Sequence, residues 1–353
     1  MAVLWAQSPA GQPDGLGSRA IHRTAPSRAV SVRYSPEGRE RPSLWSAIKT
    51  LHRLEVGPVY FFVLIWGMTV AARQPSDLWS VPAILAFLIN GLSLFSGFVL
   101  NNYSDYPIDR RSQIKGYVAD AVERVGRSRT LVLYWVEQAI TVVAAVAVSL
   151  LLHNWAFVVV KLAGIVSGMM YNGEPVRLKR RGIWNPVIFF IRFGFVPGMI
   201  AYLAVHDGVI GTGGWMLLIG ASLLMFSRGF WNSVSDTAED RAEEIVTPSV
   251  RYGPMTAMRF AVVILVPACV LVGSGLWLLL GPVYAIFGVA GAAGATVFRG
   301  WLLHRAGDDD GAVALLASPI RRTDARWSQL TYVTITLAGL AHVIAASALV
   351  GSP

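Results

Sequence analysis

"SVPAILAFLINGLSLFSGFVLNNYSDYPIDRR", residues Ser80 to Arg111, is the stretch that decides the fold class. The run 80–101 contains no Asp, Glu, Lys or Arg, and its 22 residues would cross a hydrocarbon layer of about 30 Å as a helix. Two asparagines, two aspartates and two arginines then crowd the end of the stretch. The stretch therefore predicts a membrane-spanning helix that carries a polar site at one end.

Apolar runs of this kind recur along the whole chain. Of its 353 residues, 54% are hydrophobic and only 14% are charged, whereas soluble domains carry about 25% charged residues. Nine runs are long enough to cross a membrane: 57–72, 80–101, 130–152, 155–171, 183–205, 213–234, 258–279, 281–302 and 327–350. We therefore predict an all-α, polytopic membrane protein with nine transmembrane helices, built as one domain over residues 43–350.

The positive charge of the chain, +9 in total, is concentrated in alternate loops between the apolar runs. The first loop holds only Arg73, and the third, fifth and seventh loops hold no Lys or Arg. The even-numbered loops carry Arg110, Arg111, Lys115, Arg124, Arg127 and Arg129, then Arg177, Lys179, Arg180 and Arg181, then Arg241 and Arg251, then Arg305, Arg321, Arg322 and Arg326. This pattern predicts a cytoplasmic N-terminus and an external C-terminus. It explains the basic balance without nucleic acid as a partner.

Two segments precede the first apolar run. Residues 1–42 are rich in Gly, Pro, Ser and Arg, which predicts a disordered cytoplasmic tail. The preference for Arg over Lys, with abundant Ala, Gly and Val, favours a bacterial plasma membrane over an organelle transit peptide. The segment 43–53 has apolar and basic residues at helical spacing, which predicts a short helix in the membrane interface. Those residues are Leu44, Trp45, Ile48, Lys49, Leu51 and Arg53.

The polar end of the opening stretch has a counterpart further along the chain. Its Asn and two Asp residues are spaced i, i+4 and i+8, so on a helix they share one face with a drift of about 40° per step. The same spacing, again followed by Arg, recurs at the end of the sixth apolar run, on the same predicted side of the membrane. The two copies are Asn101, Asp105, Asp109 and Arg110, and Asn232, Asp236, Asp240 and Arg241.

Two facing pairs of aspartates predict a site for Mg²⁺ and a diphosphate. Hard divalent cations bind carboxylate oxygens and often bridge them to a substrate phosphate, whereas facing carboxylates without a cation repel each other. A third segment on the same predicted side, "YNGEPVRLKRRG" at Tyr171 to Gly182, brings Arg177 and Lys179 to complete the neutralisation. As single motifs these residues could be helix caps, topology charges or an interfacial tyrosine. Their duplication on one side favours a functional site.

With these motifs the sequence resembles the UbiA-type intramembrane prenyltransferases, over about residues 45–350. The family signatures N-D-x-x-D-x-x-x-D, Y-x-x-x-P-x-R-L-K and D-x-x-x-D correspond here to 101–109, 171–179 and 236–240, and "TPSVRYG" at 247–253 is similar to a later family segment. The resemblance implies nine helices around a central cavity that cytoplasmic loops cap and that opens sideways to lipid. It also implies transfer of a prenyl group from a polyprenyl diphosphate to an aromatic or lipophilic acceptor.

The resemblance further implies a role for each matching residue. Asn101, Asp105, Asp109, Asp236 and Asp240 would hold Mg²⁺ and the diphosphate. Arg177 and Lys179 would bind phosphate oxygens, and Tyr171 would lie beside the reacting carbon.

The sequence departs from the family pattern at three places. Asn102 stands where the family usually has Asp, and Pro107 predicts that the helix kinks or ends before Asp109. The segment 119–130 lacks the Arg-Pro pair of many members, which leaves the acceptor open. A terpene cyclase of the same superfamily, which would ionise and cyclise a prenyl diphosphate without an acceptor, is the alternative function. A transporter is a more distant one, because transporter sites usually lie at the membrane midplane.

Ionisable residues within the apolar runs are further candidates. Lys161 and Glu137 are expected to pair between neighbouring spans. Arg192 and Arg228 could both face the cavity, and Arg228, two turns before Asp236, is predicted as the diphosphate contact.

Overall fold

The computed structural model describes residues 42–112, 115–206 and 208–350. The predicted disordered tail, apart from its last residue Pro42, therefore lies outside the described residues. Within the described ranges no β-strand forms, and one isolated bridge pairs Arg181 with Val246. The prediction of an all-α protein is confirmed for this part of the chain.

Nine apolar segments form the body of the molecule. They are α2 (Gly57–Ala71), α3 (Val81–Asp109), α5 (Arg127–Leu152), α6 (Ala156–Asn172), the composite helix α7 (Trp184–Phe189), η4 (Phe190–Phe195) and α8 (Val196–Leu203), then α9 (Thr212–Ser235), α12 (Pro254–Leu280), α13 (Pro282–Ala306) and α15 (Ile320–Val350). Shorter elements connect them: α1 (Leu44–His52), η1 (Leu54–Val56), η2 (Pro75–Trp79), α4 (Gly116–Val125), η3 (Leu178–Arg180), α10 (Thr237–Ala242), α11 (Pro248–Tyr252) and α14 (Asp309–Ala317).

The number of helices that qualify as membrane spans is smaller than predicted. Seven helices of the described residues are long and apolar enough to cross a membrane. Two of the nine predicted runs form shorter apolar helices, Tyr60–Ala71 and Ala156–Asn172. Every predicted run is therefore helical, but length and composition support seven spans and leave the count of nine a prediction.

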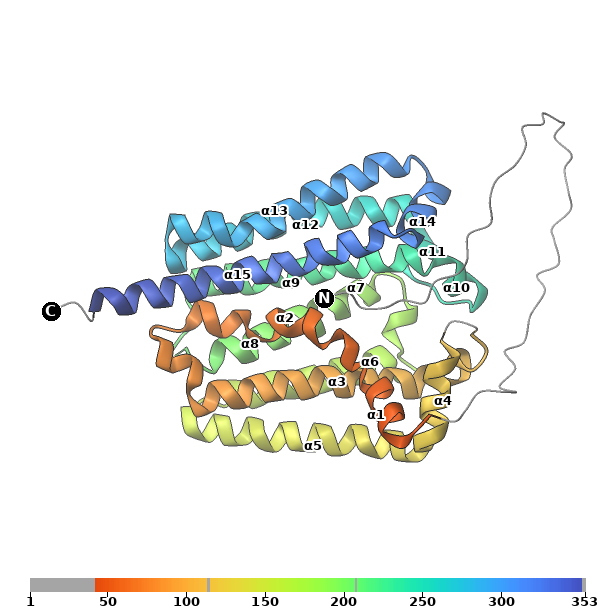
Figure 1. Cartoon of the computed structure of the whole chain (residues 1–353), viewed down its shortest axis with the longest axis horizontal. Helices are drawn as coiled ribbons and strands as arrows, with labels where there is room; N and C mark the ends of the chain where they lie inside the picture. Colours follow the sequence, from red (N-terminus) through yellow and green to blue (C-terminus); the bar gives the residue numbers. More distant parts are fainter. Residues whose placement is uncertain (1–41, 113–114, 207, 351–353) are drawn as a thin grey trace, which may run out of the picture.

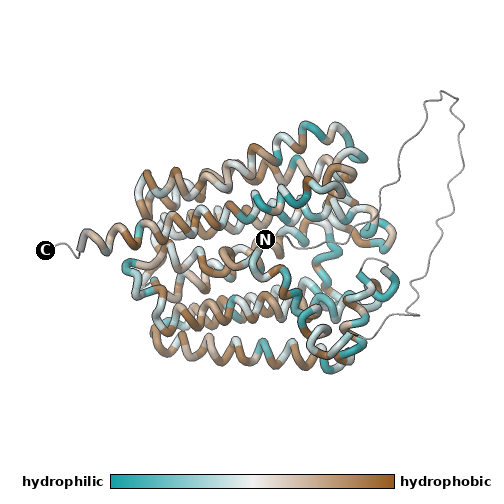
Figure 2. Tube along the Cα trace, in the orientation of Figure 1, coloured by the Kyte–Doolittle hydropathy of each residue, from teal (hydrophilic) through white to brown (hydrophobic). Residues whose placement is uncertain are grey.

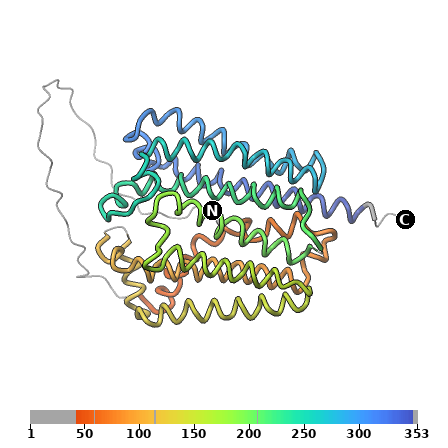
Figure 3. The backbone as a smooth tube through the Cα atoms, turned by 180° about the vertical axis from the view of Figure 1, so that it is seen from behind, coloured from red at the N-terminus to blue at the C-terminus, as the bar shows by residue number. Residues whose placement is uncertain are grey.

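The long helices lie side by side in one bundle. The first half of the chain occupies one part of the bundle and α9, α12, α13 and α15 the other, as views from both sides show (Figures 1 and 3). Helix α15 packs against α2, and η4 packs against α9, so the two halves are in contact. Helix α15 ends at the opposite end of the bundle from α4 and α10 (Figure 1).

Hydropathy divides the bundle along its length. Hydrophilic residues gather at the end where α4, α10 and α14 lie, and the helix bodies are mostly hydrophobic (Figure 2). Large apolar side chains also point outward along these bodies, such as Val143 with 70% exposed, Val263 with 64% and Val283 with 74%. A continuous apolar exterior of this kind suits lipid rather than water. The chain is an integral membrane protein.

Pro107 does not end α3, although the sequence predicted a kink or an end there. Proline has no backbone N–H, so the helical hydrogen bond from residue 107 to the carbonyl of Tyr103 is missing. The next turn re-forms the helical pattern, because the Arg110 N–H bonds the Tyr106 carbonyl at 3.0 Å. Helix α3 consequently runs to Asp109 and carries both acids of the first motif.

Candidate active site

A cavity of about 660 Å³ lies at the hydrophilic end of the bundle. Its walls come from segments far apart in the sequence: the end of α3, the end of α6 with η3, and the end of α9 with α10. Seven of the predicted site residues line it, namely Asn101, Asp105, Asp109, Tyr171, Lys179, Asp236 and Asp240. The structure therefore brings the two acidic motifs and the basic segment to one place.

The second motif is not a single helical face. Helix α9 ends at Ser235, Asp236 forms the break, and α10 begins at Thr237. The Asp240 N–H still bonds the Asp236 carbonyl at 2.8 Å, so the two residues keep the i, i+4 relation across the break. Both carboxylates therefore reach the cavity although they belong to different elements.

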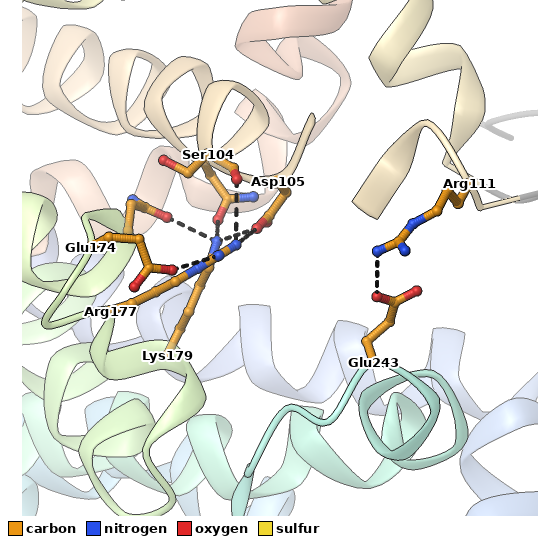
Figure 4. Close-up of polar contacts among 9 residues, drawn as sticks. Ser104, Asp105, Arg111, Glu174, Arg177, Lys179 and Glu243 are labelled. Carbon is orange, nitrogen blue, oxygen red and sulfur yellow. Dashed lines mark hydrogen bonds and ion pairs between the residues drawn. The ribbon is translucent and has the colours of Figure 1, made fainter. Parts of the chain in front are cut away.

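The basic segment is tied to the first motif through Asp105. Lys179 Nζ donates to Asp105 Oδ1 at 2.6 Å, and Arg177 Nη2 donates to the same oxygen at 2.8 Å (Figure 4). Lys179 also donates to Asn101 Oδ1 at 3.1 Å and to Asn172 Oδ1 at 3.2 Å. Burial outweighs the attraction of Asp105 and lowers the pKa of Lys179. An additional anion near Lys179 would therefore stabilise its charged form.

The other aspartates of the two motifs form no ion pair with a described residue. The Asp109 side chain is almost buried, at 4% exposed, and forms no ion pair with a described residue. Burial, with help from the charge of Asp236, raises the pKa of Asp240 to about 7, against a hydrogen bond from Thr247. Negative charge on these carboxylates is therefore poorly compensated, which is the condition that a divalent cation would relieve.

The arrangement fits Mg²⁺ held together with a substrate. Among the described residues, no three His, Cys, Asp or Glu side chains come close enough to hold a metal by themselves. Mg²⁺ is commonly bound by one or two protein carboxylates, several waters and the oxygens of a substrate phosphate. The two aspartate pairs offer such a partial donor set in the lining of one cavity.

Tyr171 lines the cavity among aromatic residues. Its ring lies edge-on to Phe189 at 6.4 Å between centroids, and Lys179 Nζ lies 5.8 Å from the ring centroid. This position differs from that of an interfacial tyrosine facing lipid, because the side chain borders the polar cavity. Its role beside the reacting carbon remains a prediction.

Two predictions about charged residues within the spans are corrected. Arg228 is absent from the described lining of the cavity and borders a small separate pocket together with Arg299, whereas Arg192 lines the cavity. Glu137 pairs with His52 at 2.7 Å and not with Lys161. Lys161 Nζ instead donates to Ser93 Oγ at 2.7 Å and Gln138 Oε1 at 2.9 Å.

Arg53 and Asn102 form a unit that sequence reasoning missed. Arg53 lines the cavity, its Nη2 donates to Asn102 Oδ1 at 3.2 Å, and its guanidinium lies 5.7 Å from the Phe98 ring centroid. Asn102 Nδ2 donates to the Leu51 carbonyl at 2.8 Å. Asn102 is fully buried. Its side chain therefore holds the end of α1 and orients Arg53, and it is not a ligand in the cavity. The amphipathic pattern of 43–53 located α1 but gave no sign of this contact.

Two ion pairs connect the segments that follow the acidic motifs. Arg111 Nη2 lies 3.0 Å from Glu243 Oε2 (Figure 4), and Lys115 Nζ lies 2.9 Å from Glu239 Oε2. Burial lowers the pKa of Lys115, but Glu239, Asp236 and Asp109 more than offset this and raise it overall. Lys115 therefore adds a cation to the cavity lining that appeared in the sequence only as a topology charge.

Comparisons with known proteins agree with this architecture. The model of the UbiA prenyltransferase family matches residues 60–320. The bacteriochlorophyll synthase 33 kDa chain of Rhodobacter capsulatus is 29% identical over 154 residues, which cover 40% of this chain and about half, 49%, of that protein.

Solved structures give the same result at the level of the fold. A UbiA homolog from Archaeoglobus fulgidus bound to GPP and Mg²⁺ is 16% identical with a TM-score of 0.66, over 85% of this chain and 100% of that one. A UbiA homolog from Aeropyrum pernix K1 is 16% identical with a TM-score of 0.58, over 84% of this chain and 98% of that one.

Proposed function

This chain belongs to the UbiA prenyltransferase family, and we propose that it is a Mg²⁺-dependent enzyme that transfers a prenyl group from a polyprenyl diphosphate to a lipophilic or aromatic acceptor. One observation carries the proposal: a single cavity gathers both aspartate pairs and Lys179 at one end of an apolar bundle. The A. fulgidus homolog that is described with GPP and Mg²⁺ has the same fold, which supports the substrate class.

The diphosphate would bind at the acidic and basic walls of the cavity. Asp105, Asp109, Asp236, Asp240 and the Asn101 amide would hold Mg²⁺ together with the phosphate oxygens. Lys179 and Arg177, which already lie within hydrogen-bond distance of Asp105, would donate to the remaining oxygens. Bound Mg²⁺ would supply positive charge that stabilises the departing diphosphate.

In the transfer itself, the bond between the prenyl carbon and the diphosphate oxygen breaks, and its electron pair leaves with the oxygen. A nucleophilic atom of the acceptor supplies the pair for the new bond, and the acceptor then loses a proton to water at the cavity mouth. The rings of Tyr171, Phe189 and Phe193 border the cavity, where their π faces would stabilise an allylic cation and displace water. The Tyr171 ring centroid lies 5.8 Å from Lys179 Nζ and so beside the site proposed for the diphosphate.

We also propose that the hydrophilic end faces the cytoplasm of a bacterium. The basic residues of alternate loops gather at this end, as the positive-inside rule requires. Prenyl chains and lipophilic acceptors would reach the cavity from the surrounding lipid.

The experiment is a diphosphate-release assay with the full-length chain, geranylgeranyl diphosphate, Mg²⁺ and a lipid extract of the source membranes that supplies the acceptor. We expect Asp105→Ala and Asp236→Ala to reduce release by about 100-fold or more, since each removes charge that acts on the leaving group. Asp310→Asn is the matched control, because Asp310 is exposed on α14 away from the cavity lining. Unchanged release in both alanine variants would refute the enzyme hypothesis.

Product analysis of a reaction without acceptor tests the cyclase alternative. In the sequence, the presence of Asn102 where the family usually has Asp favoured this alternative. The hydrogen bonds of Asn102 with Leu51 and Arg53 account for this residue without reference to the reaction. We expect the diphosphate to stay largely intact without acceptor. A cyclic hydrocarbon or alcohol formed in high yield would establish cyclisation instead.

A further inference from the structure

We propose that Lys161 and Arg192 form a binding subsite for the carboxylate of an acidic acceptor, at the floor of the cavity. The inference rests on the proposed function, because it assigns a place to the second substrate of the same site.

Lys161 is a buried cation without a described carboxylate partner. It lies in α6, is 2% exposed, and its Nζ donates to two neutral acceptors, Ser93 Oγ at 2.7 Å and Gln138 Oε1 at 2.9 Å. An ammonium group has three N–H donors, so a third remains for a ligand. No ion pair joins Lys161 to any residue of the described ranges.

Arg192 is a second cation that lines the same recess as Lys161 and has no described carboxylate partner. It belongs to the π-helical turn η4, and its guanidinium fits between α3 and α6 because Gly97 and Gly168 leave room: a Cβ at Gly97 would overlap Nη2, and one at Gly168 would overlap Nη1. Within the described residues it forms neither a hydrogen bond nor an ion pair, and its guanidinium lies 5.8 Å from the Phe193 ring centroid. Arg192 lines the cavity, and guanidinium donors that no described residue accepts can therefore serve a ligand there.

The two cations border a recess that continues the cavity into the bundle. The recess shares Tyr60, Leu94, Arg192 and Phe193 with the main cavity, and its lining contains Lys161 but no Asp or Glu. Ser93, the partner of Lys161, precedes Asn101 by eight residues on α3, roughly 12 Å along the helix. An anion at Lys161 would therefore be separate from the diphosphate at the acidic motifs.

Charge and position together indicate the ligand class. Unpaired positive charge inside the bundle costs free energy. A bound carboxylate would neutralise this charge and accept hydrogen bonds from the Arg192 guanidinium and the Lys161 ammonium. The same charges would repel an allylic cation, so the prenyl chain is a poor occupant of the recess. A carboxylic acid bound by its acid group at the floor would point its other end toward the diphosphate, where an acceptor must react.

The test measures binding to the full-length chain in detergent, with Mg²⁺ and the unreactive analogue geranyl thiodiphosphate present. The probes are benzoate and its neutral counterpart benzamide, followed by the shift of the unfolding temperature as each is titrated. In Gln138→Glu, the new carboxylate would lie beside Lys161 and compete with benzoate. Gln74→Glu, on the exposed turn of η2, is the matched control, and Lys161→Met removes the charge directly.

We expect benzoate to bind about tenfold more tightly than benzamide, and Gln138→Glu and Lys161→Met to abolish this preference while Gln74→Glu keeps it. Binding of geranyl thiodiphosphate with Mg²⁺ should change less than about twofold in all variants, because the acidic motifs are untouched. Equal binding of the two probes, or a benzoate preference that survives both variants, would overturn the subsite. Failure of the natural chain to bind geranyl thiodiphosphate with Mg²⁺ would instead contradict the proposed function.

Discussion

Asn102 shows how one amide can serve the site without touching the substrate. It donates to the Leu51 carbonyl and accepts from Arg53, which an amide can do and a carboxylate cannot. In Asn102→Asp the donor is lost, the Leu51 carbonyl is left buried and unpaired, and Arg53 gains a carboxylate partner. We expect a loss of about 1 to 3 kcal/mol in the free energy of unfolding and a KM for prenyl diphosphate raised several-fold.

Thermal unfolding and steady-state kinetics of the purified variant would check this prediction. Asn154→Asp is the matched control, because the Asn154 side chain acts through its oxygen, which accepts from the Ala156 N–H at 3.0 Å, and Asp keeps that oxygen. If both variants behave alike, the amide of Asn102 has no special role.

Asp240 predicts a pH dependence of stability in the absence of metal. Its pKa is about 7 in the folded chain against 3.8 for an ordinary Asp, so between these values the folded state binds more protons than the unfolded state. Stability therefore falls as pH rises through this window and levels off above it. Asp240→Asn should be little changed in stability at pH 4 and more stable than the natural chain at pH 8, relative to Asp310→Asn, in unfolding measurements with chelator. A constant difference across pH would contradict the raised pKa.

At residue level, the sequence predicted that the acids of both motifs lie at one site, but between the two arginines of the spans it preferred Arg228, which borders another pocket, to Arg192, which lines the cavity. Spacing of four residues predicted that the two acids of each motif lie together. Within α3 this follows from one helical face, and in the second motif the Asp240 N–H bond to the Asp236 carbonyl keeps the relation across the break between α9 and α10. Arg228 precedes Asp236 by eight residues, and its side chain borders a different pocket. The π-helical turn η4 sets the direction of the Arg192 side chain, and no sequence pattern predicted this turn.

At the scale of elements, α10 is the part of the site with the weakest support. It has six residues and is held to the segment after α3 by the exposed pairs Lys115–Glu239 and Arg111–Glu243. Exposed pairs contribute roughly 0 to 1 kcal/mol each, so they can order a short helix but not fix the fold. The double variant Glu239→Gln and Glu243→Gln should therefore unfold normally.

The effect of this double variant should be local. We expect amide hydrogen exchange over residues 237–247 to accelerate several-fold, with other segments unchanged. Glu55→Gln is the control, since Glu55 is exposed near α1. Exchange that is as slow as in the natural chain would mean that packing of α11 against α9, rather than charge, orders this segment.

At the scale of the whole molecule, the sequence located the apolar helices but not their neighbours. Helices that are apolar on most sides present no distinct face, so nothing in the pattern specified that α15 would pack on α2. The polar residues at the helix ends predicted which segments meet at one end of the bundle, because hydrophilic loops must gather at the bundle ends. The family resemblance, and not periodicity, supplied the central cavity.

The two short apolar helices, α2 and α6, decide how often the chain crosses the membrane. The 17 residues of α6 span roughly 25 Å, less than a typical hydrocarbon thickness of about 30 Å, so it crosses only with local thinning or with help from flanking residues. If α2 and α6 both cross, the turn at Asn154 and the segment at Ser318 lie on opposite sides. In a Cys269→Ser background, a membrane-impermeant maleimide added to intact cells should label Asn154→Cys, and should label Ser318→Cys only after lysis. Labelling of both cysteines in intact cells would exclude nine crossings and the cytoplasmic site together.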